Sequence, residues 1–212
     1  KFYSVHNVDL KPHKKFTLSL IEMISYGHRF DFSYMIPSLY MVTQSFTGCG
    51  DNLIMGMCGD YKPFDGLEIY FQGMLDDVNV NELFKFDLDT RITGSGILGA
   101  VYVPENFILE YVSADLTMVT PWMYSHPDFS GGSLVGVTGL NMQNMLHNGY
   151  CMSSNINPNS WKLNLKTSMR PVENLKLDFA FSLVRHSNVN ESLPLDEAYW
   201  YLTRTKLNDG KS

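Results

Sequence analysis

The stretch SWKLNLKTSMRPVENLKLDFAFSLVRHSN, residues 160–188, decides the fold class of this chain. Apolar and polar residues alternate through two runs, which a short turn containing a proline joins. Because successive side chains of a β-strand point to opposite faces of a sheet, this period of two predicts two half-buried strands. The apolar sides of the two runs consist of Trp161, Leu163, Leu165, Met169, Leu175, Leu177, Phe179, Phe181 and Leu183. The function of the chain depends on what covers these residues, a protein core or lipid.

The same pattern of strand, turn and strand occurs four times along the chain. Pro12, Pro63, Pro104 and Pro171 each start a turn of a few residues between two alternating runs. Proline presets φ for the first central position of a turn and has no N–H for a strand ladder, so it suits a tight connection. Four such turns predict four antiparallel hairpins, and therefore about eight strands.

Much longer connections separate these hairpins, at residues 27–51, 77–90 and 120–159. Outer-membrane barrels alternate short turns with long loops in this way, whereas loops of this length are uncommon in a compact soluble domain. Runs of about ten residues also match tilted strands that cross a bilayer. The pattern therefore favours lipid as the cover of the apolar side. We expect the four proline turns at one end of the sheet, and the loops containing Ile36 and Tyr124 at the other.

The composition limits the alternatives. The chain has 212 residues, of which 44% are hydrophobic and 18% charged, as in a folded protein. No apolar run approaches the roughly 18 residues of a membrane helix. A net charge of −6 without a basic cluster argues against a nucleic-acid partner. Three cysteines without a CxxC pair, and no acidic run with calcium-loop spacing, predict no metal and no cofactor. We expect one domain, residues 1–212, whose oligomeric state the sequence leaves open.

Residues 185–188, RHSN, contain the side-chain types of a nucleophilic hydrolase site. Such a site requires the serine and histidine side chains within hydrogen-bond reach of each other. His186 and Ser187 are neighbours at the end of an alternating run, so their side chains point to opposite faces. We therefore expect no catalytic residues and no enzymatic activity.

The polar sides of the runs permit two interpretations. A closed interior must satisfy its polar groups, so these residues are expected to form a network of paired charges that stiffens the sheet. Alternatively, aromatic and polar residues of the long loops hold sugars, because sugar hydroxyls bond to carboxylates and amides. The residues of the first interpretation are Asp60, Glu68, Gln72, Asp76, Glu110, Lys162, Lys166, Lys176 and Asp178. Those of the second include Tyr26, Tyr34, Trp122 and Tyr124.

Three segments in order, ISYGHRFDFSYMIPSLY, GDNLIMGMCGDYKPFDGLEIYFQGMLDD and FILEYVSADLTMVTPWMYSHPD, resemble the Wzi-type capsule-assembly outer-membrane proteins and their barrel relatives. The resemblance covers residues 5–190. It implies an all-β, antiparallel up-and-down outer-membrane β-barrel that binds or organises surface (capsular) polysaccharide, with outer-membrane lipid and polysaccharide as its partners. The matching segments contain the candidate ligand-binding residues Tyr26, Arg29, Asp76, Asp77, Glu110, Trp122 and Tyr124.

The chain is shorter than such a barrel and ends YLTRTKLNDGKS, residues 201–212, without the usual terminal aromatic residue. We therefore expect about eight to nine strands that form a section of a larger barrel in the bacterial outer membrane. Two other functions stay open: a porin-like channel for small solutes, and a soluble lipid-binding β-barrel with its apolar face inward. A plugged lumen would favour the polysaccharide function, and an open lumen would favour the channel.

Overall fold

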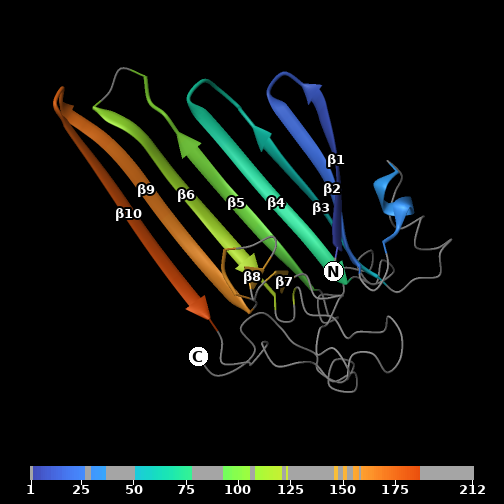
Figure 1. The fold of residues 1–212 in the computed structure, drawn as a ribbon. Helices are drawn as coiled ribbons and strands as arrows, with labels where there is room; N and C mark the ends of the chain where they lie inside the picture. The colour runs from blue at the N-terminus through green and yellow to red at the C-terminus, as the bar shows by residue number, and fades with distance from the viewer. Residues whose placement is uncertain are drawn as a thin grey trace, which may run out of the picture.

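Eight long strands form one antiparallel sheet in the computed structural model (Figure 1). The structure describes residues 2–26, 30–36, 51–77, 93–105, 108–120, 123, 146–147, 150–151, 155–157 and 159–186. The strands of the sheet are β1 (Phe2–His13), β2 (Phe16–Tyr26), β3 (Asn52–Tyr61), β4 (Leu67–Asp77), β5 (Thr93–Tyr102), β6 (Leu109–Val119), β9 (Ser160–Val172) and β10 (Leu175–His186). The smaller elements are the 3₁₀ turn η1 (Phe32–Met35) and the paired strands β7 (Leu146–His147) and β8 (Tyr150–Cys151).

Each long strand pairs with the next long strand along the chain, in the order β1-β2-β3-β4-β5-β6-β9-β10. This order confirms the expected all-β, antiparallel up-and-down class. Among the described residues no pairing joins β1 to β10, so these two strands are the edges of the sheet. The part of the chain that the structure describes contains no helix long and apolar enough to cross a membrane.

The four hairpin turns lie together at one end of the sheet, shown at the top of Figure 1. They are the turns near Pro12, Pro63, Pro104 and Pro171, at one end as the sequence predicts, but Pro12 and Pro171 are the second-last residues of β1 and β9 and do not start the turns. Neighbouring hairpins are tied there by main-chain bonds, such as that from the Lys62 N–H to the Lys15 carbonyl at 2.8 Å. The long connections leave from the opposite end, which we call the long-connection end. Ile36 lies there, whereas Tyr124 is outside the described residues.

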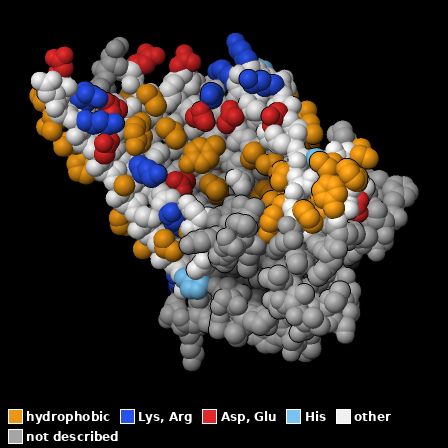
Figure 2. Space-filling model, in the orientation of Figure 1, with side chains coloured by type: hydrophobic (Ala, Val, Ile, Leu, Met, Phe, Trp, Pro, Cys, Tyr) orange, Lys and Arg blue, Asp and Glu red, His pale blue; other side chains and the backbone are white. Residues whose placement is uncertain are grey.

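The strand register divides the sheet into two chemically different faces, because residues paired directly across strands share a face. The polar face contains Asp9, Thr17, Ser19, Asp60, Glu68, Tyr70, Gln72, Asp115, Lys162, Asn164, Lys166, Asp178 and Ser182. The apolar face contains Leu20, Met55, Met57, Ile69, Phe71, Leu98, Leu116, Leu163, Leu165, Leu177, Phe179, Phe181 and Leu183. Figure 2 shows Lys, Arg, Asp and Glu side chains gathered over the upper part of the sheet, towards the hairpin turns.

Much of the apolar face is uncovered by the described residues. Leu98 on the central strand β5 is 61% exposed, and Phe179 and Phe181 on the edge strand β10 are 54% and 55% exposed. If lipid covers the apolar side, Leu165, Leu177, Phe179, Phe181, Ile69 and Phe71 are expected to be exposed, and Leu165, Phe179 and Phe181 are. Leu177, Ile69 and Phe71 are instead half-buried, so for these three residues the expected exposure is wrong. The apolar face therefore does not form a closed core among the described residues.

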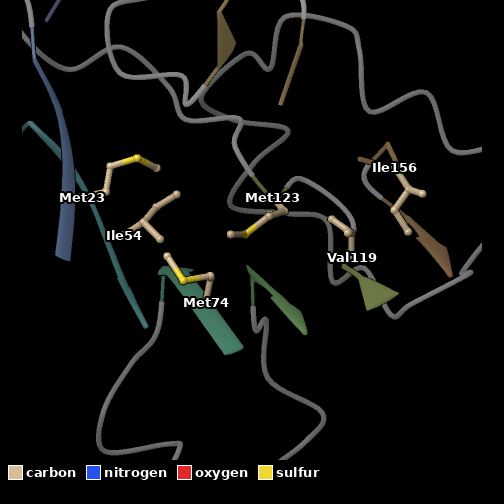
Figure 3. Packing of buried hydrophobic residues seen from close by; sticks show 6 residues of the cluster. All are labelled: Met23, Ile54, Met74, Val119, Met123 and Ile156. Carbon is tan, nitrogen blue, oxygen red and sulfur yellow. The ribbon is translucent and has the colours of Figure 1, made fainter. Parts of the chain in front are cut away.

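Buried hydrophobic packing is instead concentrated at the long-connection end. A cluster that we call the end core consists of Met23, Ile54, Met74, Val119, Met123 and Ile156 (Figure 3). Its strand residues come from the polar face, as the pairing of Met23 with Ile54 shows. Met123 and Ile156 come from the chain between β6 and β9. At this end the polar face is therefore covered by packed apolar side chains.

Candidate functional site

A row of polar side chains crosses the middle of the polar face. Directly paired residues from β2 to β10 form this row: Thr17, Asp60, Tyr70, Gly99, Asp115, Asn164 and Ser182. The Asn164 Nδ2 donates to Asp115 Oδ1 at 2.8 Å, and the Ser182 hydroxyl donates to Asn164 Oδ1 at 2.8 Å. Because these bonds run from β6 through β9 to β10, they join three strands by their side chains.

Tyr70 fits into this row because the neighbouring position on β5 is a glycine. A Cβ atom at Gly99 would lie 2.4 Å from the Tyr70 Cζ and 2.5 Å from the phenolic oxygen. The ring of Tyr70 therefore lies across the backbone of β5, with its hydroxyl on the side of Asp115 in the row. Any larger residue at position 99 would displace the ring from this place.

A hollow of about 330 Å³ lies beside Tyr70 on the polar face. Its lining includes the hydroxyls of Thr17 and Ser19, the carboxylate of Asp60 and the carboxamide of Gln72. Its volume is at the lower end of the range of small-molecule sites, which combine apolar surface with a few placed polar groups. Hydroxyl, carboxylate and carboxamide groups beside an aromatic ring can hydrogen-bond and stack a sugar.

A network of charges occupies the hairpin-turn end of the same face. The two oxygens of Glu110 are both engaged: Oε1 accepts from Arg170 Nε at 2.9 Å, and Oε2 accepts from the Ser168 hydroxyl at 2.8 Å. The ammonium of Lys176 lies 3.5 Å from Glu110 Oε2 and 3.6 Å from Asp178 Oδ1. These contacts support the interpretation that paired charges stiffen the sheet, at least at this end.

The structure does not bring the described candidate ligand residues together. Tyr26 is buried on the apolar face, with its ring 5.5 Å from that of Phe2 and 4.8 Å from that of Tyr34. Asp76 is the second-last residue of β4, at the long-connection end of the sheet. Glu110 belongs to the charge network at the opposite end. The remaining candidates are not placed: Arg29, Trp122 and Tyr124 lie outside the described residues, as does the side chain of Asp77.

His186 contacts Ser160, a serine other than the neighbouring Ser187 considered in the sequence analysis. His186 Nδ1 lies 2.7 Å from the hydroxyl oxygen of Ser160, its direct partner across β9 and β10. Ser160 is 1% exposed, so this contact satisfies a buried hydroxyl and does not present a nucleophile to solvent. Within the described ranges no three His, Cys, Asp or Glu side chains gather as a metal site. Cys58, on the polar face, is a free thiol.

Sequence reasoning also missed Tyr70, Asp115 and Asn164, which form the centre of the polar row. The alternation places each residue on the polar side of its own strand. It does not reveal which residue of the next strand lies opposite, so the hydrogen bond from Asn164 to Asp115, 49 positions apart, was not predictable. The glycine at position 99 that leaves room for Tyr70 lies on the next strand, so this pairing too is visible only in the register.

Comparisons with protein-family models, with curated proteins and with solved structures found no match to this chain. The resemblance to the Wzi-type proteins therefore stays a prediction from the sequence.

We expect replacement of Asn164 by leucine to lower the free energy of unfolding by about 2 kcal/mol, because it removes two hydrogen bonds, to Asp115 and to Ser182. Urea titrations of the wild-type and variant proteins would measure the change. Lys166→Met is the matched control, because Lys166 lies on the same strand and face, and we expect a smaller change there. Equal effects of the two substitutions would contradict a stabilising function of the row.

Proposed function

We propose that this chain forms a section of the wall of a bacterial outer-membrane β-barrel and acts without catalysis, by binding or organising surface polysaccharide. The observation that carries the proposal is the opposition of the two faces of one sheet. Leu98, Phe179 and Phe181 expose half or more of their side chains on the apolar face, while the polar face holds charges, hydroxyls and amides. Membrane barrels require this combination, because their outer face meets hydrocarbon and their inner face lines a lumen.

The lengths of the strands support the same proposal. The eight long strands contain between 10 residues, as in β3, and 13 residues, as in β9. A tilted strand needs about 9–11 residues to cross the hydrocarbon core of a bilayer. Every long strand can therefore cross it, with hairpin turns on one side and long connections on the other.

The open edges of β1 and β10 support the proposal that this sheet is a section of a larger barrel. Unpaired backbone N–H and C=O groups cost several kcal/mol each in hydrocarbon, so membrane-spanning sheets close on themselves. In the described part of the chain neither edge strand has a second neighbour. Further strands beside β1 and β10 would complete the barrel that we propose.

The end core favours polysaccharide binding over a porin-like channel. A general channel needs an open lumen, but at the long-connection end the polar face is covered by packed side chains, among them Val119 and Met123, each 0% exposed. The hollow beside Tyr70 lies on the same face, away from this cover. A lumen partly filled by packed residues would hinder the passage of solutes, but it would still allow a polysaccharide to bind to the inner face of the barrel.

Binding of oligosaccharides to the folded protein in lipid vesicles tests the proposal. Neutral dextran and acidic alginate oligosaccharides serve as probes, and calorimetry measures the dissociation constant. We expect saturable binding of at least one probe, and we expect Tyr70→Ala to weaken it about tenfold, the equivalent of 1.4 kcal/mol. Leu98→Ala, on the apolar face of the next strand, is the control and should leave binding unchanged.

Three other outcomes would contradict the proposal. Rapid efflux of small solutes from the vesicles, without oligosaccharide binding, would favour the porin-like channel. Recovery of the protein in water without detergent, with a fatty acid bound, would favour the soluble lipid-binding barrel. Equal weakening by Tyr70→Ala and Leu98→Ala would place the binding site away from the polar face.

A further inference from the structure

The short turn η1 is packed onto the apolar face, beyond the end of β2. Tyr34 of this turn is 0% exposed and packs with Ile24 and Tyr26, which lie on the apolar face of β2, and with Leu53 of β3. The hydroxyl of Ser4, which is paired with Ile24, donates to the Tyr34 carbonyl at 2.7 Å. The turn therefore lies over the apolar face at the long-connection end.

Polar contacts hold the turn in one conformation. Asp31 Oδ1 accepts hydrogen bonds from the Ser33 N–H at 3.0 Å and from the Ser33 hydroxyl at 2.6 Å. The hydroxyl of Tyr34 donates to Asp51 Oδ2 at 2.6 Å, and Asp51 is 7% exposed. The Asp31 bonds thus fix the start of the turn itself, and Tyr34 ties the turn to β1 through Ser4 and to the residue before β3 through Asp51.

The turn presents its other apolar side chains outward. Phe30, Phe32, Met35 and Ile36 are 53%, 73%, 62% and 59% exposed. Figure 2 shows hydrophobic side chains gathered where Figure 1 places η1. The ring of Phe30 lies 4.9 Å from that of Phe32 and 5.7 Å from that of Phe2, so the exposed aromatic residues are continuous with the apolar face. Removing these apolar side chains from water is favourable, so a cover over them would stabilise the protein.

We infer that η1 is an anchor at the membrane interface, with Phe30, Phe32, Met35 and Ile36 inserted at the boundary between lipid headgroups and acyl chains. This inference rests on the proposed membrane function. Irregular backbone exposed to lipid is not tolerated within hydrocarbon, so a turn cannot lie deeper than this boundary. Aromatic residues concentrate there, because their rings suit a site between water and hydrocarbon.

The position of the anchor also orients the barrel. The long connections of outer-membrane barrels are on the outer side of the membrane. Since η1 lies at the long-connection end, the anchor marks the outer boundary of the lipid-covered part of the apolar face. The hairpin turns would lie at the periplasmic boundary.

Tryptophan fluorescence in vesicles of brominated phosphatidylcholine tests this depth. The background is the full chain with its three tryptophans replaced by phenylalanine. Phe32→Trp reports on η1, and Leu98→Trp, at the middle of the apolar face, is the matched reference. Both positions are more than half exposed, at 73% and 61%, so neither substitution crowds a packed site. One set of vesicles has bromines near the headgroup end of the acyl chains, and the other has them near the methyl end.

We expect Phe32→Trp to lose about twice as much fluorescence to shallow bromines as to deep ones, since interfacial residues sit at the headgroup boundary. Leu98→Trp should show the reverse order. Adding Tyr34→Ala, which removes the buried contact of the turn, should reduce the shallow quenching of Phe32→Trp and leave that of Leu98→Trp unchanged.

The outcomes separate the anchor from the membrane proposal itself. Deep quenching of Leu98→Trp without shallow quenching of Phe32→Trp would overturn the anchor and leave the lipid-facing sheet intact. Insensitivity of Phe32→Trp quenching to Tyr34→Ala would likewise overturn it. Absence of quenching at both positions would remove the membrane proposal and the anchor together.

Discussion

Phe179→Arg will lower the free energy of unfolding by about 2–4 kcal/mol in lipid vesicles, the cost of a cation near the midplane on the lipid face of a barrel. Phe179 lies near the middle of β10 on the apolar face and is 54% exposed, so the loss cannot come from a disrupted core. The arginine would have to leave water for hydrocarbon or pull water into the bilayer. Urea titrations of the protein folded in vesicles would measure the cost.

Ser182→Arg is the matched variant, three positions along the same strand and on the polar face. We expect it to cost about 1 kcal/mol, the contribution of the hydrogen bond from Ser182 to Asn164. The added charge itself should cost little, because an arginine on the polar face can stay hydrated or pair with an acidic side chain. A soluble barrel with an inward apolar face predicts a heavy penalty at Phe179 in water as well. Equal or inverted costs of the two variants in lipid would exclude lipid as the cover of the apolar face.

Ile54→Ala will destabilise the protein by about 2–5 kcal/mol, the range for truncation of a buried aliphatic side chain that leaves a cavity. Ile54 is 0% exposed in the end core, beside Met23 and Met74 (Figure 3). This cluster joins four strands of the polar face to Met123 and Ile156, so a cavity there loosens the whole long-connection end. Denaturant titration with tryptophan fluorescence would measure the effect.

Leu20→Ala is the control for Ile54→Ala. Leu20 is on the neighbouring strand β2 but on the apolar face, where it is 44% exposed. We expect a cost well below that of Ile54→Ala in detergent, because little packed volume is lost. A tolerated Ile54→Ala would show that the end core does not stabilise the protein, and it would remove the argument for a partly filled lumen.

The sequence by itself determined the strands, their hairpins and the chemistry of their two sides. These features depend on short-range rules: a period of two in polarity, and prolines such as Pro63 that start tight turns. Each rule acts within about a dozen residues, so no distant contact was needed to apply it. The same rules predicted that Phe179 and Phe181 share one face, because alternation assigns every second residue to one face.

Only the tertiary structure decided which residues meet across strands and which are buried at the ends. Asn164 reaches Asp115 because β6 and β9 are neighbours in one particular register, and a shift of one residue would turn each side chain to the other face. Tyr26 and Tyr34, expected to hold sugars, are buried against the apolar face because η1 folds back over β2. Such packing depends on the path that the chain takes as it leaves β2, and that path has no local signal in the sequence.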